Sequence, residues 1–170
     1  MRPLPLLLSF LLATPALAQA PAELAQRLPA EAAGWERRDV TDFESRPGGA
    51  GLGAAVEYRP PGAPGVATVF LYRARGGPEA ELARAQEEIR ALAPMRQYTV
   101  GAARAVPPPR PGWRCAVLEQ AYAGGQRADS HVCVGAQRGW TMKLRVSVPA
   151  GAEVREVMGA LAMAAGQAVP

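Results

Sequence analysis

The alternation of hydrophobic and polar positions predicts most of the secondary structure. Residues 66–73 read VATVFLYR, a β-branched and aromatic run between turn-forming residues, which is typical of a β-strand. Apolar or alternating runs predict further strands over residues 35–43, 53–59, 96–105, 113–122, 127–135 and 139–148. Apolar residues at helical spacing predict helices over residues 22–29, 79–92 and 152–166.

Short connections join several of the predicted strands. Gly124-Gly125 separates the strands at 113–122 and 127–135, and residues 136–139 separate the next pair. Because hairpins pair strands antiparallel, we expect an α+β fold with a largely antiparallel sheet. The sheet would contain about six to seven strands packed against amphipathic helices, as a two-layer or an α/β/α sandwich.

The first 18 residues have the features of an export signal. Arg2 supplies positive charge, residues 6–13 are largely apolar, and Ala16-Leu17-Ala18 matches a small-x-small cleavage site. We expect cleavage after Ala18, with Ala20 as the alternative, and one mature domain over residues 19–170 in a bacterial periplasm. An uncleaved membrane anchor is the alternative to cleavage, but the apolar stretch is shorter than the roughly 20 residues that span a bilayer. No stable membrane span is expected after cleavage.

The amino-acid composition and the motifs of the chain exclude several classes of function. The chain has 18 arginines and a single lysine, a bias typical of GC-rich coding sequences, so its formal net charge of +4 says little about partners. Basic residues form no cluster, and we therefore expect no nucleic-acid binding. The motifs of phosphate-binding loops, zinc proteases and serine hydrolases are missing from the sequence. Export also disfavours enzymes that depend on ATP or NAD(P)H, so we predict a protein without cofactors.

Cys115 and Cys133 are the only cysteines. Two cysteines in an exported protein favour a disulfide, and the predicted hairpin at Gly124-Gly125 brings them onto adjacent strands. The bridge would close a loop of about 19 residues, which is worth about 3 kcal/mol on the chain-entropy model.

A polar sheet face follows from this pairing. If Cys115 lies opposite Cys133, His131 lies opposite Val117 and Asp129 lies opposite Glu119. Extended across the second hairpin, the same pairing gives three more pairs: Asp129 with Arg145, His131 with Lys143, and Cys133 with Thr141. One face would then be the apolar core, and the other would carry Glu119, Arg127, Asp129, His131, Lys143 and Arg145. We predict that a ligand binds on this polar face, through Lys143 and Arg145 if it is an anion; cross-strand charge pairing on a solvated face is the alternative.

A metal or thiol site is the competing hypothesis for the same strands. His131 and Cys133 project from one strand face because they are two residues apart, and Cys115 would lie opposite. Such a site requires reduced cysteines, and zinc normally takes a fourth ligand. We therefore expect bridged cysteines, no metal and no catalytic residue.

The region 107–111 reads PPPRP, which favours a stiff polyproline-type connector before the strand at 113. After it come the segments WRCAVLEQAY, ADSHVCVG, GWTMKLRVSVP and the amphipathic EVREVMGALAMA, in that order. This arrangement resembles the PsbP-like family of small exported α+β domains, and it is similar to other small exported bacterial proteins. The resemblance implies a non-enzymatic binding or assembly domain.

The sequence thus predicts a small exported protein without catalytic activity that binds a small ligand or an envelope protein. The alternative is a thiol- or metal-dependent periplasmic protein that uses Cys115, His131 and Cys133.

Overall fold

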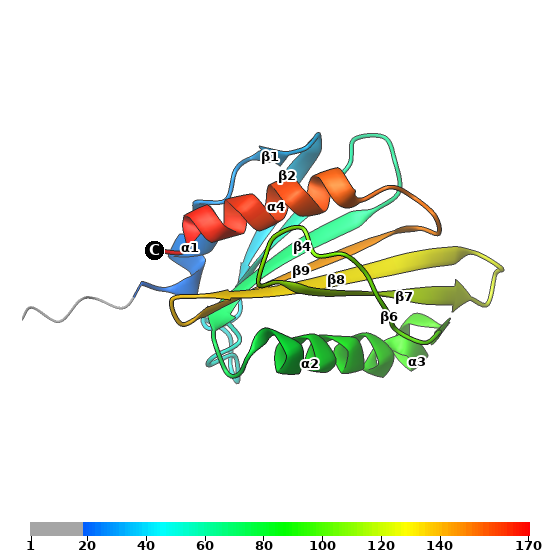
Figure 1. Ribbon diagram of the computed structural model, residues 1–170, viewed down its shortest axis with the longest axis horizontal. Helices are drawn as coiled ribbons and strands as arrows, with labels where there is room; N and C mark the ends of the chain where they lie inside the picture. Colours follow the sequence, from blue (N-terminus) through cyan, green and yellow to red (C-terminus); the bar gives the residue numbers. More distant parts are fainter. Residues whose placement is uncertain (1–18) are drawn as a thin grey trace, which may run out of the picture.

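The computed structural model describes residues 19–170, in which nine strands form one antiparallel sheet (Figure 1). The strands are β1 (Glu31–Ala32), β2 (Trp35–Asp42), β3 (Ala54–Arg59), β4 (Val66–Arg73), β5 (Tyr98–Val100), β6 (Arg104–Ala105), β7 (Arg114–Tyr122), β8 (Arg127–Gln137) and β9 (Trp140–Pro149). The helices of this region are α1 (Pro21–Gln26), α2 (Pro78–Ala91), α3 (Ala93–Arg96) and α4 (Arg155–Ala168). The predicted export signal at residues 1–18 lies outside the described residues.

The strand order is β1-β2-β3-β4-β9-β8-β7-β5, and β6 also pairs with β7. Figure 1 shows α4 on one side of the sheet and α2 on the other, so the helices and the sheet form three layers. The predicted α+β class with an antiparallel sheet is confirmed, and the structure selects the α/β/α alternative. The sheet is larger than the predicted six to seven strands.

The extra strands come from short segments that carry no periodic signal. The strand predicted over residues 96–105 is interrupted: α3 ends at Arg96, Gln97 has a left-handed backbone with a φ of 56°, and only β5 and β6 pair with β7. β1 is a further strand of two residues. Runs of two or three residues are too short for an alternation of polar and apolar positions to be recognised.

Two hydrophobic cores lie on opposite faces of the sheet. The main core fills the space between the central strands and helices α1 and α4; its large members include Leu24, Leu71, Trp140, Leu144 and Leu161. The second core is smaller and lies under α2, where Ala85 and Ile89 pack on Ala116, Leu118 and Val132 of β7 and β8. Both faces of β8 and β9 therefore carry buried residues.

The first hairpin has the predicted register. Cys115 lies opposite Cys133, Val117 opposite His131, and Glu119 opposite Asp129. This register was recoverable from the sequence because a disulfide requires two residues that face the same side of neighbouring strands.

The predicted register of the second hairpin is wrong. Asp129 lies opposite Val148, His131 opposite Val146, and Cys133 opposite Leu144. β8 continues to Gln137, which pairs with Trp140, so only Arg138 and Gly139 form the loop, with φ values of 49° and 79°. Positive φ at both loop residues is the geometry of a type I′ turn, in which Asn-Gly or Asp-Gly is the usual signal and Arg-Gly is not. The shift is an odd number of residues, so every side chain of β9 changes face relative to the prediction.

Candidate functional site

A pocket of about 670 Å³ opens on the α4 side of the sheet. β8 contributes His131 and Cys133, and β6 contributes Arg104. The opposite wall consists of the turn and first residues of α4, including Glu153 and Arg155. Three segments far apart in sequence therefore build the pocket.

The proline run forms a further wall of this pocket. We call residues 106–109, which connect β6 toward β7, the proline strap; all four line the pocket. Figure 1 shows the β6–β7 connection rising from the sheet toward α4. At its end, Arg110 Nη1 donates a hydrogen bond to the Ala162 carbonyl of α4 over 3.4 Å. The strap is thus tied to α4 and gives the pocket an apolar side with few internal degrees of freedom.

His131 is the only histidine of the chain, and it lines the pocket. Its Nε2 atom is buried and has no hydrogen-bond partner among residues 19–170. Burial lowers the pKa of the imidazole, and the Arg104 guanidinium lowers it further against the opposing effects of Asp129 and Glu153. The lowered pKa favours the neutral ring at pH 7, in which one ring nitrogen donates and the other accepts a hydrogen bond.

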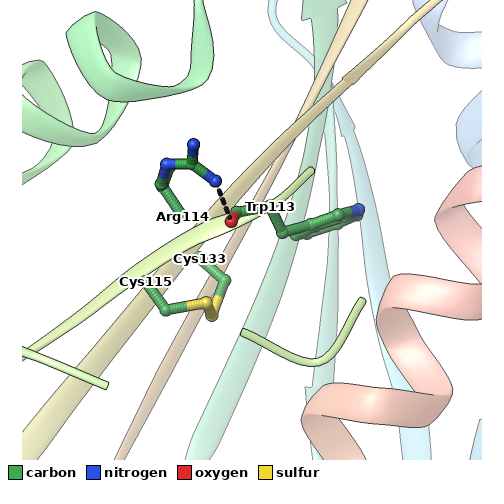
Figure 2. Close-up of a disulfide and its surroundings, with 4 residues drawn as sticks. All are labelled: Trp113, Arg114, Cys115 and Cys133. Atoms are coloured by element: carbon green, nitrogen blue, oxygen red, sulfur yellow. Dashed lines mark hydrogen bonds between the residues drawn. A yellow bond between two sulfur atoms is a disulfide. The ribbon is translucent and has the colours of Figure 1, made fainter. Parts of the chain in front are cut away.

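Cys115 and Cys133 form the predicted disulfide, which bridges directly opposed residues of β7 and β8 (Figure 2). Figure 2 also shows Trp113 and Arg114 pointing to opposite sides of β7, with the indole on the side of α4. The guanidinium of Arg114 forms an ion pair with Glu79 of α2 at 2.6 Å. Because both sulfur atoms belong to the disulfide, the cysteines present no thiolate to the pocket in this state.

Lys143 and Arg145 lie on the other face of the sheet, away from His131. Lys143 Nζ lies 2.5 Å from Glu88 Oε2 of α2 and 4.6 Å from the centroid of the Phe70 ring, and the residue is only 8% exposed. Arg145 Nε donates to Ser130 Oγ over 3.2 Å. The Lys143–Glu88 pair ties α2 to the sheet, and the Arg145–Ser130 bond joins β9 to β8. The two residues of the predicted anion site are therefore engaged in contacts within the protein.

Glu119 and Asp129 share the pocket's side of the sheet but do not line it. Glu119 forms an ion pair with Arg127 of the facing strand. Asp129 Oδ2 accepts a hydrogen bond from the Gly151 amide over 2.9 Å, which holds the turn that leads into α4. Of the five predicted binding residues, only His131 contributes to the pocket wall.

Sequence reasoning did not single out Arg104, Glu153 and Arg155. None of them belongs to a motif, and an isolated arginine carries little information in a chain with 18 of them. Within residues 19–170, no group of three or more His, Cys, Asp or Glu side chains is arranged to hold a metal ion. The helices of this same region are too short or too polar to cross a bilayer.

The fold and the site of residues 19–170 together define a small α/β/α domain with a ligand-sized pocket between its sheet and α4. No protein-family model matches the chain, and no curated protein matches it either. Among solved structures, the chain is similar to a crystal structure of a protein from Bacteroides thetaiotaomicron VPI-5482 at 1.50 Å resolution. The two are 15% identical with a TM-score of 0.39, and the match covers 76% of this chain. The chain spans less than half of that protein, 43% of its length.

Proposed function

We propose that the protein is a non-catalytic binding or accessory protein of the bacterial periplasm and that its ligand occupies the pocket beside His131. The observation that carries this proposal is a pocket of about 670 Å³ whose wall includes His131, the only histidine, and the buried Nε2 of this residue has no hydrogen-bond partner within residues 19–170. This volume lies within the range of about 300–1,000 Å³ typical of small-molecule sites.

The surroundings of the pocket support binding rather than chemistry. The wall combines apolar groups from the proline strap and Met158 with polar side chains from β6, β8 and the start of α4, so it can contact both the apolar and the polar parts of a ligand. Ser130 precedes His131 on β8 but lies on the opposite face of the sheet, opposite Ser147, so the pair has no nucleophile–base geometry. The disulfide suits an oxidising compartment, which supports the periplasmic location.

Native and denaturing mass spectrometry of protein purified from the periplasm without reductant tests the proposal. A denatured mass of residues 19–170 less two hydrogens is expected, together with extra mass that appears only in the native spectrum. The Gly159→Phe variant should lose this extra mass, because Gly159 lines the pocket, a Cβ atom added there meets no atom within 4 Å, and the phenyl ring would occupy the ligand's space. Gly159→Ala is the matched control and should retain it.

Two results would contradict the proposal. One is the same bound mass in the Gly159→Phe variant, which would place the ligand elsewhere. The other is the absence of bound mass together with unchanged His131 resonances when a small-molecule extract of the periplasm is added. Intact thiols with a bound metal would instead support the thiol- or metal-dependent alternative.

A further inference from the structure

Three charged side chains surround the pocket. Arg104 belongs to β6, and Glu153 and Arg155 stand at the start of α4. Within residues 19–170, none of the three side chains takes part in an ion pair, whereas the paired basic residues are Arg38, Arg59, Arg84, Arg90, Arg114, Arg127 and Lys143. The charges around the pocket are therefore available to a bound molecule.

The sum of these charges favours one sign of ligand. Two guanidinium groups and one carboxylate give a net charge of +1 (2 − 1), and the imidazole of His131 adds none when neutral. The first turn of α4 has no side-chain cap, and its positive dipole end lies on the same wall. A cationic ligand would be repelled by the two guanidinium groups, and a ligand with several negative charges would be repelled by the Glu153 carboxylate. The charges of the pocket therefore favour a ligand with a single negative charge.

The remaining wall specifies the rest of the ligand. Apolar groups line the pocket beside the disulfide-bonded Cys133, and they come from the proline strap, Val154 and Met158. Val154 and Met158 are 8% and 5% exposed, so they belong to the packed core and give this wall a fixed shape. A ligand that fills the pocket therefore buries an apolar body against the strap and places its charged end toward the arginines.

We infer that the pocket selects a molecule with a single carboxylate on an apolar body. Arg104 and Arg155 bind the carboxylate, since a guanidinium presents paired N–H donors that match the two carboxylate oxygens. His131 lies in the same wall of the pocket, and the proline strap contacts the apolar part of the ligand. This inference rests on the proposed function, because it names the ligand class of that same pocket.

Octanoate, octanol and octylamine are suitable probes, since they share a chain length and differ in charge. His131 is the only histidine, so its imidazole C–H signals in proton NMR report on the pocket without assignment of the whole spectrum. We expect octanoate to shift these signals and to bind at least about tenfold more tightly than octylamine. Octanol should bind with an affinity between the two.

Paired charge variants identify the groups responsible. Arg104→Gln/Arg155→Gln should weaken octanoate binding by about tenfold or more and leave octanol binding unchanged. Arg96→Gln/Arg138→Gln is the control, because it removes the same charge from two arginines that do not line the pocket and form no ion pair within residues 19–170. The control should bind octanoate as the parent does.

The outcomes separate this inference from the proposed function. Octylamine that binds as tightly as octanoate, or an Arg104/Arg155 variant that matches the control, would overturn the carboxylate selectivity and leave a binding pocket in place. If none of the three probes shifts the His131 signals, the inference fails. The native mass spectrum then decides on the proposed function independently.

Discussion

The contact between Gly135 and Trp113 gives the sharpest test of the packing. Gly135 lies in β8, and a Cβ atom built there would be 2.3, 2.5 and 2.6 Å from Cε2, Nε1 and Cδ2 of the Trp113 indole. Carbon atoms in ordinary contact are about 3.5–4.0 Å apart. The Gly135→Ala change therefore forces the ring to retreat by roughly 1 Å.

The retreat is costly because the indole has little room. Trp113 is 5% exposed and belongs to the core on the α4 side. Overpacking of this kind lowers the free energy of unfolding by about 1–3 kcal/mol. For a domain of this size, each kcal/mol corresponds to about 2–4 °C in Tm, so we expect a fall of roughly 2–12 °C.

Urea unfolding followed by far-ultraviolet circular dichroism measures the effect. Gly159→Ala is the matched control: it is the same substitution inside α4, it meets no atom within 4 Å, and it should raise stability by about 0.5–1 kcal/mol. In a Trp113→Leu background, the penalty of Gly135→Ala should fall, because the clashing ring is gone. A Gly135→Ala protein as stable as the parent would refute the packing described here.

Three further predictions concern other parts of the fold. Tyr72→Phe should cost about 1.5–3 kcal/mol, because it removes a 2.9 Å buried hydrogen bond to the Glu81 carboxylate, itself 2% exposed; urea unfolding measures it. Replacement of both Cys115 and Cys133 by alanine should cost about 3 kcal/mol relative to the oxidised parent, which urea unfolding without reductant measures. Burial lowers the folded pKa of His131 below its unfolded value, so the unfolded state takes up the proton first. Stability should therefore fall as pH drops through about 6.5 toward the folded pKa, and His131→Gln should lack this part of the pH dependence of the urea midpoint.

Each of these predictions has a result that contradicts it. The hydroxyl of Tyr122 forms no hydrogen bond within the described residues, so Tyr122→Phe should leave the free energy of unfolding almost unchanged. An equal loss of unfolding free energy in the Tyr72→Phe and Tyr122→Phe variants would show that the Glu81 hydrogen bond does not stabilise the fold. A cysteine-free protein as stable as the oxidised parent would contradict the loop-closure argument. An unaltered pH profile in His131→Gln would show that the imidazole is not shielded from solvent.

Much of the fold follows from local patterns. The strand at 66–73 and its neighbours on both sides were readable because β-branched and aromatic residues stand between clear turn signals. The register of the hairpin at Gly124-Gly125 was predictable from the two cysteines, since only one register places them directly opposite each other and a slip by one residue would put them on opposite faces. The short strands β1, β5 and β6 left no such signal, because their pairing depends on the edge of the sheet that they meet.

The composition of the candidate site could not be predicted from local patterns. Lys143 and His131 looked like neighbours under the expected turn, yet a two-residue loop at Arg138-Gly139 puts them on opposite faces. The predicted and the observed registers both preserve the alternation of apolar and polar residues along β9. Because α4 covers one face of the sheet and α2 covers the other, a polar residue of β9 need not face solvent, and polarity does not reveal which register is correct. Local patterns in the sequence thus predict the class of fold, most of the strands and helices, and the disulfide, because these depend on residues that are near one another along the chain. The face that each polar residue occupies and the segments that enclose the pocket follow only from the folded arrangement, because they depend on turn geometry and on the docking of α4 and the proline strap.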